Sequence, residues 1–252
     1  MQLLQKYYVH KCTNQNPKPM NKSLLFLFLI TIASAGLAQD CNLFIPLIEN
    51  KGMQYQSFNR RDRLEGTQDV MIKTVTRHGD HTEALISTKY YDSRERFQHE
   101  AEYTIRCKGD ELIIDIQSML DQAMLAGFKD MEITMTTVDI SLPSRMEPGD
   151  QLPEARVEMT VRSAGTTISE ITFITRNRKV EAIETITTPA GTFECYKISY
   201  EAFTETRTMG IPFRVTAKGF EYYAQGIGNV RSEFYDDRDR LQSYQVLSRL
   251  YQ

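Results

Sequence analysis

The feature that most constrains this fold is an alternation of apolar and polar residues with a period of two. In residues 97–107, Phe97, His99 and Tyr103 fall on one face of an extended strand, and glutamates and an arginine fall on the other. Such alternation is typical of a strand with one buried and one solvated face. It predicts that His99 points inward. There it is expected to be neutral and hydrogen-bonded at pH 7, because a buried charged imidazole is costly.

Similar β-rich runs recur along the chain, with turn residues between them. They are 70–77, 82–91, 97–107, 112–116, 154–162, 166–176, 180–187, 192–202 and 241–251. Short connections favour antiparallel neighbours. About ten or more strands in one chain indicate an all-β fold, which is a sandwich, a roll or a barrel. Since no shift in composition marks a second domain, residues 39–252 are expected to form a single domain.

Glycine and proline mark the tightest turns. Pro189 fixes φ and Gly191 permits a positive φ, so the chain turns sharply between two strands there. Gly226 and Gly228 allow a bulge or a bend in a strand. We interpret these four residues as fold-defining rather than ligand-binding. Residues 143–153, which contain three prolines, are expected to form a surface loop between two strand-rich halves.

One short helix interrupts the strand pattern. Ser118 and Asp121 match a capping box, and Gly127 can end the helix. Met119 and Met124 lie on its apolar face. We interpret the helix as a plug at one end of a curved sheet. The alternative is a methionine-rich lid over an apolar cavity.

The leader predicts export. Residues 20–38 combine the basic Lys22, an apolar run and small residues at a cleavage position after Ala38. Residues 1–19 are interpreted as an upstream extension. Cys41 follows an aspartate rather than the small residue that a lipidation signal requires. We therefore expect an unlipidated, soluble protein in the periplasm or the medium, with no transmembrane segment in the mature chain.

Three cysteines remain after the leader: Cys41, Cys107 and Cys195. Outside the cytosol, this number suggests one disulfide and one buried free thiol. The sequence leaves all three pairings open. We favour Cys41–Cys107, because a loose N-terminus gains most from a covalent tie. The alternative is three small buried hydrophobic residues.

Composition and motifs exclude several functions. Without the four lysines of the leader, 26 basic residues face 33 acidic ones, and a net charge of −7 argues against a nucleic-acid binder. No serine-hydrolase elbow, phosphate-binding loop or dinucleotide fingerprint is present, so no catalytic residue and no cofactor is expected. His78 and His81, with Asp80 between them, could face one metal ion, but polar residues are expected at such a turn anyway.

Several short motifs together resemble the TapB-like family of exported bacterial proteins, whose domain has no known function. They are Cys41 with Pro46 and Gly52, Cys107, Gly149-Asp150-Gln151-Leu152, residues 188–198 (TPAGTFECYKI), residues 222–230 (YYAQGIGNV) and residues 233–236 (EFYD). The motifs span nearly all of residues 39–252, although Tyr222 stands where the family often has tryptophan. The resemblance implies a signal peptide and a periplasmic or surface location. It also implies a curved antiparallel roll, similar to the half-open barrels of lipoprotein carriers, and it carries no catalytic residues.

These observations predict an exported, non-enzymatic protein that binds or carries an apolar small molecule or lipid, because a curved sheet encloses apolar side chains. The candidate ligand-binding residues are Phe97, His99, Tyr103, Met119 and Met124. A structural or assembly partner of an envelope complex is the alternative. A metal-assisted hydrolase built on His78, Asp80 and His81 is the weaker alternative.

Overall fold

A computed structural model describes residues 44–118 and 131–251. Within these residues the chain forms strands, turns and loops, with no helix. The strands are β1 (Gly52–Asn59), β2 (Leu64–Arg77), β3 (His81–Asp92), β4 (Phe97–Lys108), β5 (Glu111–Ile114), β6 (Glu132–Val138), β7 (Ile140–Pro143), β8 (Ala155–Ser163), β9 (Thr166–Thr188), β10 (Gly191–Thr208), β11 (Ile211–Ala224), β12 (Gly228–Tyr235) and β13 (Leu241–Tyr251). The predicted all-β, antiparallel class is confirmed. The predicted helix and its residues Met119 and Met124 lie outside the described residues.

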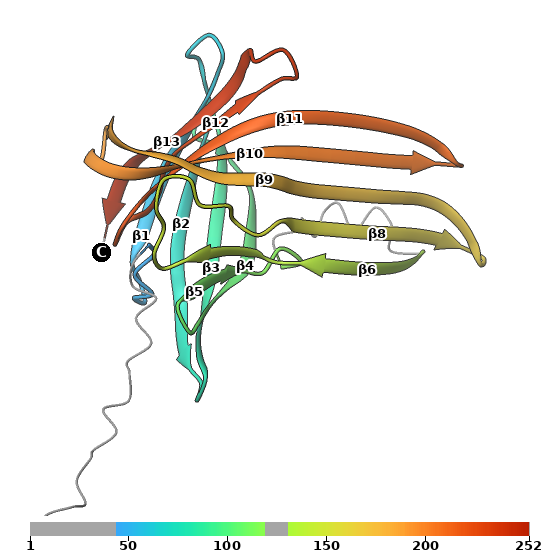
Figure 1. The fold of residues 1–252 in the computed structure, drawn as a ribbon, viewed down its shortest axis with the longest axis horizontal. Helices are drawn as coiled ribbons and strands as arrows, with labels where there is room; N and C mark the ends of the chain where they lie inside the picture. Colours follow the sequence, from blue (N-terminus) through green and yellow to red (C-terminus); the bar gives the residue numbers. More distant parts are fainter. Residues whose placement is uncertain (1–43, 119–130, 252) are drawn as a thin grey trace, which may run out of the picture. The chain divides into compact units, whose positions relative to one another are not determined.

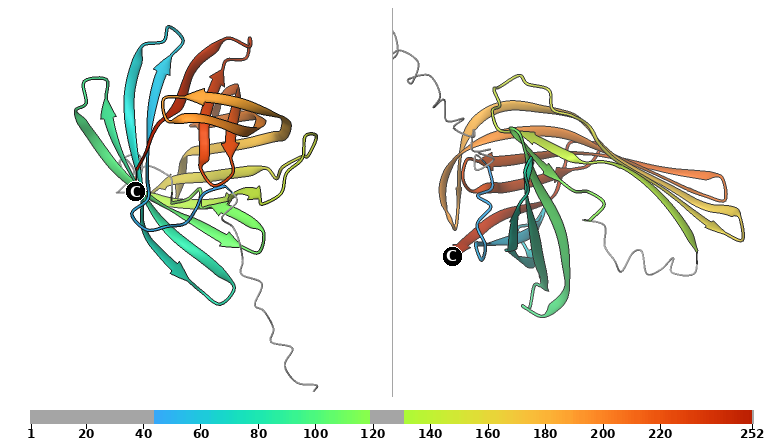
Figure 2. Two further views of the ribbon diagram at one scale, coloured as in Figure 1. Left: turned by 90° about the vertical axis from the view of Figure 1, so that its left-hand side faces the viewer. Right: turned by 90° about the horizontal axis from the view of Figure 1, so that it is seen from below.

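The strands form one sheet that is nearly closed into a barrel-shaped roll (Figures 1 and 2). The order across the sheet is β6-β8-β9-β10-β11-β12-β13-β1-β2-β3-β4-β5-β7. Its two edge strands, β6 and β7, are consecutive in the chain and are separated only by Asp139. The two edges of the sheet therefore meet at Asp139.

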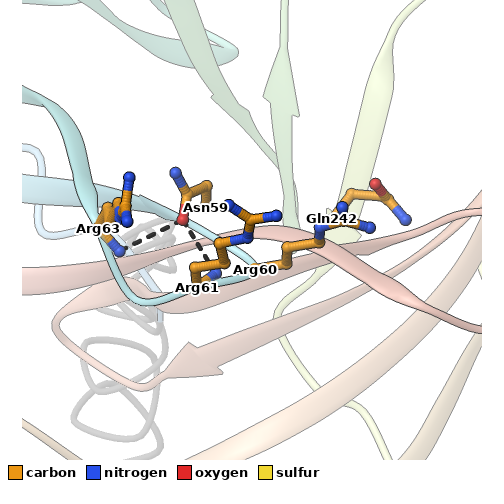
Figure 3. Close-up of a pocket in the computed structure, with 5 residues that line it drawn as sticks. All are labelled: Asn59, Arg60, Arg61, Arg63 and Gln242. Atoms are coloured by element: carbon orange, nitrogen blue, oxygen red, sulfur yellow. Dashed lines mark hydrogen bonds between the residues drawn. The ribbon is translucent and has the colours of Figure 1, made fainter.

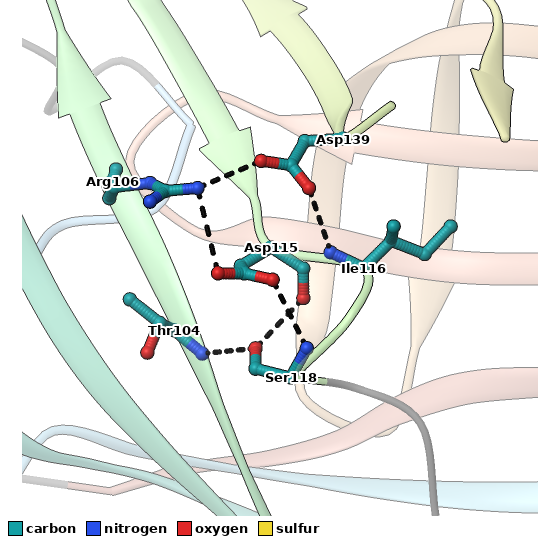
Figure 4. A network of polar contacts seen from close by, with 6 residues as sticks. All are labelled: Thr104, Arg106, Asp115, Ile116, Ser118 and Asp139. Atoms are coloured by element: carbon teal, nitrogen blue, oxygen red, sulfur yellow. Dashed lines mark hydrogen bonds and ion pairs between the residues drawn. The ribbon is translucent and has the colours of Figure 1, made fainter. Parts of the chain in front are cut away.

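Asp139 is held at this seam by Arg106 of β4 and by the backbone of Ile116, which follows β5 (Figure 4). Its Oδ2 atom accepts a hydrogen bond from Nη2 of Arg106 in β4 at 2.8 Å, and its Oδ1 atom accepts one from the backbone N–H of Ile116 at 3.2 Å. Beside them, Ser118 Oγ accepts a hydrogen bond from the Thr104 N–H and donates one to the Asp115 carbonyl. These contacts fix residues 115–118, which follow β5, and Asp139 at the seam.

The hydrophobic core lies on the inner face of the roll. Phe44 is fully buried there and makes edge-to-face contacts with Tyr196 of β10 and Tyr223 of β11. Residues from β1 to β5 and from β13 meet them, among them Ile72, Ile86 and Leu247. Because alternate residues of each strand point inward, the apolar residues of the predicted period-two pattern form this core.

Five strands continue beyond the core as a flat projection, which we call the arm (Figure 1). It consists of β6, β8, residues 166–175 of β9, residues 201–208 of β10 and residues 211–217 of β11. β12 pairs with β11 only from Lys218 to Ala224, so the outer edge of residues 211–217 has no neighbouring strand in the described part of the chain.

Two expectations about chain breaks are wrong. Asn177 and Arg178 do not separate two strands but form a bulge within β9, where Asn177 has a φ of 54°. The proline-containing loop is not simply a surface loop, since Met146 and Leu152 are buried. The physical reason is that β8 pairs with β9 only up to Thr175. Beyond Thr175 the loop lies along β9 in the position that β8 would otherwise occupy, and the Leu152 N–H donates a hydrogen bond to the Arg178 carbonyl.

The glycines singled out in the sequence lie at turns. Pro189 and Gly191 lie at the β9–β10 connection, and Gly191 has a φ of 142°, which favours glycine. Gly226 and Gly228, at φ 71° and 106°, lie at the connection between β11 and β12. They thus form a turn between strands rather than the expected bend within one.

Candidate functional site

The arm has one apolar face. Cross-strand pairing aligns Met159 with Ile171, and Thr206 with Ile171 and Phe213, so these side chains share a face. The cross-strand rows two residues before and after this one point to the same face. The apolar residues on it, together called the apolar arm face, are Ile133, Met135, Val157, Met159, Val161, Ile171, Phe173, Ile211, Phe213 and Val215. Between those of β9 and those of β11, the strand β10 contributes Thr204, Thr206 and Thr208. It continues the inner face of the roll, because β10 and β11 run through both without a shift in their mutual register.

Exposure is uneven across the apolar arm face. Val157, Met159 and Val161 in β8 are buried. On β11, Ile211 and Phe213 are 74% and 69% exposed. Single exposed apolar side chains are ordinary in proteins, but several apolar side chains gathered on one face mark a candidate binding surface.

The opposite face of the arm is charged. Glu205 bonds to the guanidinium groups of both Arg207 and Arg214, and these hydrogen bonds lower the pKa of its carboxyl. Arg156 lies between Glu154 and Glu158 and pairs with both. Only one face of the arm is therefore suited to an apolar ligand.

The free edge of β11 is poorly suited to pairing with another strand. Pro212 lies in the middle of the exposed run and lacks a backbone N–H. Proline and charged residues on edge strands hinder the addition of further strands. The exposed side chains of Ile211 and Phe213 are therefore available to a ligand that contacts the face rather than the edge.

A buried polar group lies on the inner face between the core and the arm. Arg178, at the β9 bulge, is fully buried, and its Nη1 donates to the carbonyl oxygens of Ser141 and Pro153 at 3.0 and 2.8 Å. Its Nη2 atom is buried without a hydrogen-bond partner in the described part of the chain. Burial raises the pKa of the Glu221 carboxyl in β11, while the positive charge of Arg178 acts in the opposite direction. Burial also raises the pKa of Tyr200.

Comparison with protein families identifies the chain's relatives. A family model described as DUF3108-like matches residues 49–247, which is most of the sequence. The chain belongs to the DUF3108-like family. None of the curated proteins matches it.

Two solved structures share the fold of this DUF3108-like chain. One is a Bacteroides fragilis NCTC 9343 protein assigned as exported, with a YmcC-like fold; it is 21% identical, with a TM-score of 0.63, over 83% of this chain and 99% of that one. The other is a Parabacteroides distasonis ATCC 8503 protein assigned as a lipoprotein; it is 24% identical, with a TM-score of 0.66, over 84% of this chain and 100% of that one. At these identities the likeness concerns the fold alone.

The predicted ligand-binding residues are not brought together as expected. His99 is exposed rather than buried, and its ring stacks on Tyr90 at a centroid distance of 4.3 Å. A bulge at Gln98 places Phe97 opposite Tyr91 and His99 opposite Tyr90, so the two side chains do not share a face. Phe97 is 57% exposed. The prediction that His99 is buried is wrong because this end of β4 extends beyond the part of the sheet that the core covers.

Tyr103 does lie against the core. It is partly buried beside the core cluster, and burial raises the pKa of its hydroxyl. Met119 and Met124 lie outside the described residues. The apolar arm face was not predicted from the sequence, although Val157, Met159 and Val161 alternate with polar residues there.

The histidine pair considered for a metal site makes contacts of its own. The His81 Nδ1 atom lies 2.7 Å from Asp80 Oδ1, and the rings of His78 and His81 stack with centroids 4.5 Å apart. Among the described residues, no group of three or more histidine, cysteine, aspartate or glutamate side chains could hold a metal ion.

The cysteines occupy separate places. Cys107 is buried in β4, and Cys41 lies outside the described residues, so their pairing stays a prediction. Cys195 is a buried free cysteine, and burial raises its pKa to about 11. No helix among residues 44–118 and 131–251 is long and apolar enough to cross a membrane.

Proposed function

We propose that this DUF3108-like protein is an exported, non-enzymatic protein that binds an apolar ligand, such as the acyl chain of a lipid, on the apolar arm face. The observation that carries the proposal is the exposure of Ile211 and Phe213 on the same face as the buried Met159 and Val161. An extended apolar strip on a sheet suits a long flexible chain better than a compact polar substrate.

The surroundings support a ligand rather than an added strand. Pro212 and Arg214 disfavour pairing along the edge of β11, whereas the face is open there. The buried Arg178 and the partly buried Glu221 lie where the arm joins the roll, so a polar end of the ligand would find polar groups at that position. Few polar groups among apolar side chains are typical of sites that orient a ligand.

The proposed location follows from the leader. We expect cleavage between Ala38 and Gln39 and a periplasmic or secreted protein without a lipid anchor. N-terminal sequencing of the mature protein tests this, and acyl chains on Cys41 would contradict it. Within the DUF3108-like family, membership of the TapB-like group is also proposed, on the motifs at residues 188–198 and 222–230.

The test is a fluorescence titration of the purified protein with cis-parinaric acid, an apolar chain whose emission rises in an apolar environment. We expect saturable binding by the wild type and at least a tenfold weaker affinity in the double variant Ile211→Ser, Phe213→Ser. Phe97→Ser is the matched control, because Phe97 is a similarly exposed aromatic residue away from the arm. A wild type that does not bind, or equal weakening in the control, would contradict the proposal. In that case the alternative of an envelope assembly partner gains support.

A further inference from the structure

Three hairpin turns of the roll share one five-residue pattern. They are residues 59–63 (NRRDR), 92–96 (DSRER) and 236–240 (DDRDR), which connect β1 to β2, β3 to β4 and β12 to β13. In each turn the Oδ1 atom of the first residue accepts hydrogen bonds from the backbone N–H groups of the third and fifth residues, at 2.9–3.3 Å. In each, the fourth residue has a positive φ between 56° and 61°.

The topology places the three turns at the same end of the sheet. β12, β13, β1, β2, β3 and β4 are neighbours in that order, and each pair is antiparallel. The connections after β12, β1 and β3 therefore lie at one rim of the roll. The turns serve as internal controls for one another, because they share a backbone geometry and differ in side chains.

The three turns differ in the charge of their first residue. Asp92 Oδ2 accepts a hydrogen bond from Arg96 Nε at 2.7 Å, and Asp236 Oδ2 accepts one from Arg240 Nε at 2.8 Å. The first turn has Asn59 instead, which makes the same backbone hydrogen bonds but carries no charge. By side-chain charge, residues 59–63 sum to +2, residues 92–96 to 0 and residues 236–240 to −1.

The arginines of the first turn are consequently free of carboxylates. Arg60, Arg61 and Arg63 make no ion pair with any described residue. The acid within the turn, Asp62, accepts a hydrogen bond from the Tyr244 hydroxyl at 3.0 Å. No described residue outside the turn thus neutralises its positive charge through an ion pair.

These arginines line a pocket of about 360 Å³ together with Asn59 and Gln242 (Figure 3). The pocket is held in place from both sides. The Arg60 N–H donates to the Gln242 carbonyl at 2.9 Å, and Gln242 Nε2 donates to Asp236 Oδ2 at 3.0 Å. Two hairpins are therefore tied together around the pocket.

We propose that this pocket binds a phosphate group, supplied either by a lipid headgroup or by a free phosphate compound. Guanidinium groups recognise phosphate oxygens through paired hydrogen bonds, and several arginines that line one pocket suit a doubly charged anion. The side-chain amide of Gln242 adds a neutral polar wall. The pocket shares no residue with the apolar arm face, so this inference does not depend on the proposed function.

The test compares the wild type with Asn59→Asp at low ionic strength. The substitution keeps the hydrogen-bonding geometry of the turn and supplies the carboxylate that neutralises the fifth-position arginine in the two sister turns. Binding of inorganic phosphate is measured by calorimetry, and binding to vesicles of phosphatidic acid or of phosphatidylcholine by sedimentation. We expect Asn59→Asp and Arg61→Gln to weaken binding at least fivefold, while the matched control Arg94→Gln leaves it unchanged.

Binding of inorganic phosphate supports a free phosphate compound as the ligand, and binding only to phosphatidic acid vesicles supports a lipid headgroup. The inference is overturned if the wild type binds neither. It is also overturned if Asn59→Asp, with unchanged thermal stability, binds as well as the wild type, or if Arg94→Gln weakens binding equally.

Discussion

At the scale of single residues, the least ordinary feature is an acid and a base on the inner face of a mostly apolar roll. The Nη1 atom of Arg178 donates to two backbone carbonyls, and its Nη2 atom has no hydrogen-bond partner among residues 44–118 and 131–251. The surroundings of Glu221 disfavour the charged form of its carboxyl. Buried charges are expensive unless paired, so their presence favours a role beyond simple packing.

Glu221→Gln tests the environment of this acid. The folded pKa of Glu221 is raised above the unfolded value of about 4.3, so its neutral form is favoured in the folded state. The stability it contributes is present below the unfolded pKa and is lost as the pH rises through the folded pKa. We expect the free energy of unfolding of the wild type, relative to Glu221→Gln, to fall as the pH rises from 4 to 8. Urea unfolding across this range measures it, and a constant difference would contradict the raised pKa.

Gly66→Ala tests a close backbone approach between β2 and β3. A Cβ atom added at this position would lie 2.5 Å from the Tyr91 carbonyl oxygen, so the strand must shift. We expect a loss of about 1–3 kcal/mol in the free energy of unfolding, as for other overpacked sites. Gly79→Ala is the matched control, because a Cβ there meets no atom within 4 Å. Equal stability of the two variants in thermal unfolding would show that β2 and β3 are farther apart at Gly66 than described.

At the scale of elements, the closure of the sheet rests on a few polar contacts across the seam. Asp139 joins Arg106 of β4 to the backbone of Ile116, and Arg178 of β9 joins the carbonyls of Ser141 and Pro153. Short edge strands contribute few ladder hydrogen bonds, so side chains supply the remaining contacts.

Substitutions of Asp139 separate the two contacts at the seam. Asp139→Ala removes the ion pair with Arg106, which is partly exposed, and leaves the Ile116 N–H without its acceptor. We expect a loss of about 1–2 kcal/mol in urea unfolding. Asp139→Asn can still accept from Ile116, so it should lose less. If both variants unfold like the wild type, the seam does not depend on this residue.

Alternation in the sequence predicted most strands and their antiparallel pairing, because it reports which residues share a face. It does not report whether anything covers that face, which is why His99 was expected to be buried and the arm was not foreseen. It also fails where a bulge shifts the register, as at Gln98 and at Asn177. The arginine pocket did leave a signal, since residues 59–63, 92–96 and 236–240 repeat one pattern.

At the scale of the whole molecule, a disulfide between Cys41 and Cys107 would tie the start of the mature chain to β4. We expect it to add roughly 2–4 kcal/mol of stability, because it closes a long loop. Thiol titration of the denatured, unreduced mature protein should find one free thiol, that of Cys195. Three free thiols would refute the pairing.

The measurement that tests the central claim most directly is native mass spectrometry of the protein purified from its native cells. The account predicts that the wild type carries a bound apolar molecule. It also predicts that the Ile211→Ser, Phe213→Ser variant is recovered folded without that molecule, whereas Phe97→Ser retains it. A wild type recovered only at its bare mass, or the same bound molecule in the arm variant, would contradict the assignment of the apolar arm face as the binding site.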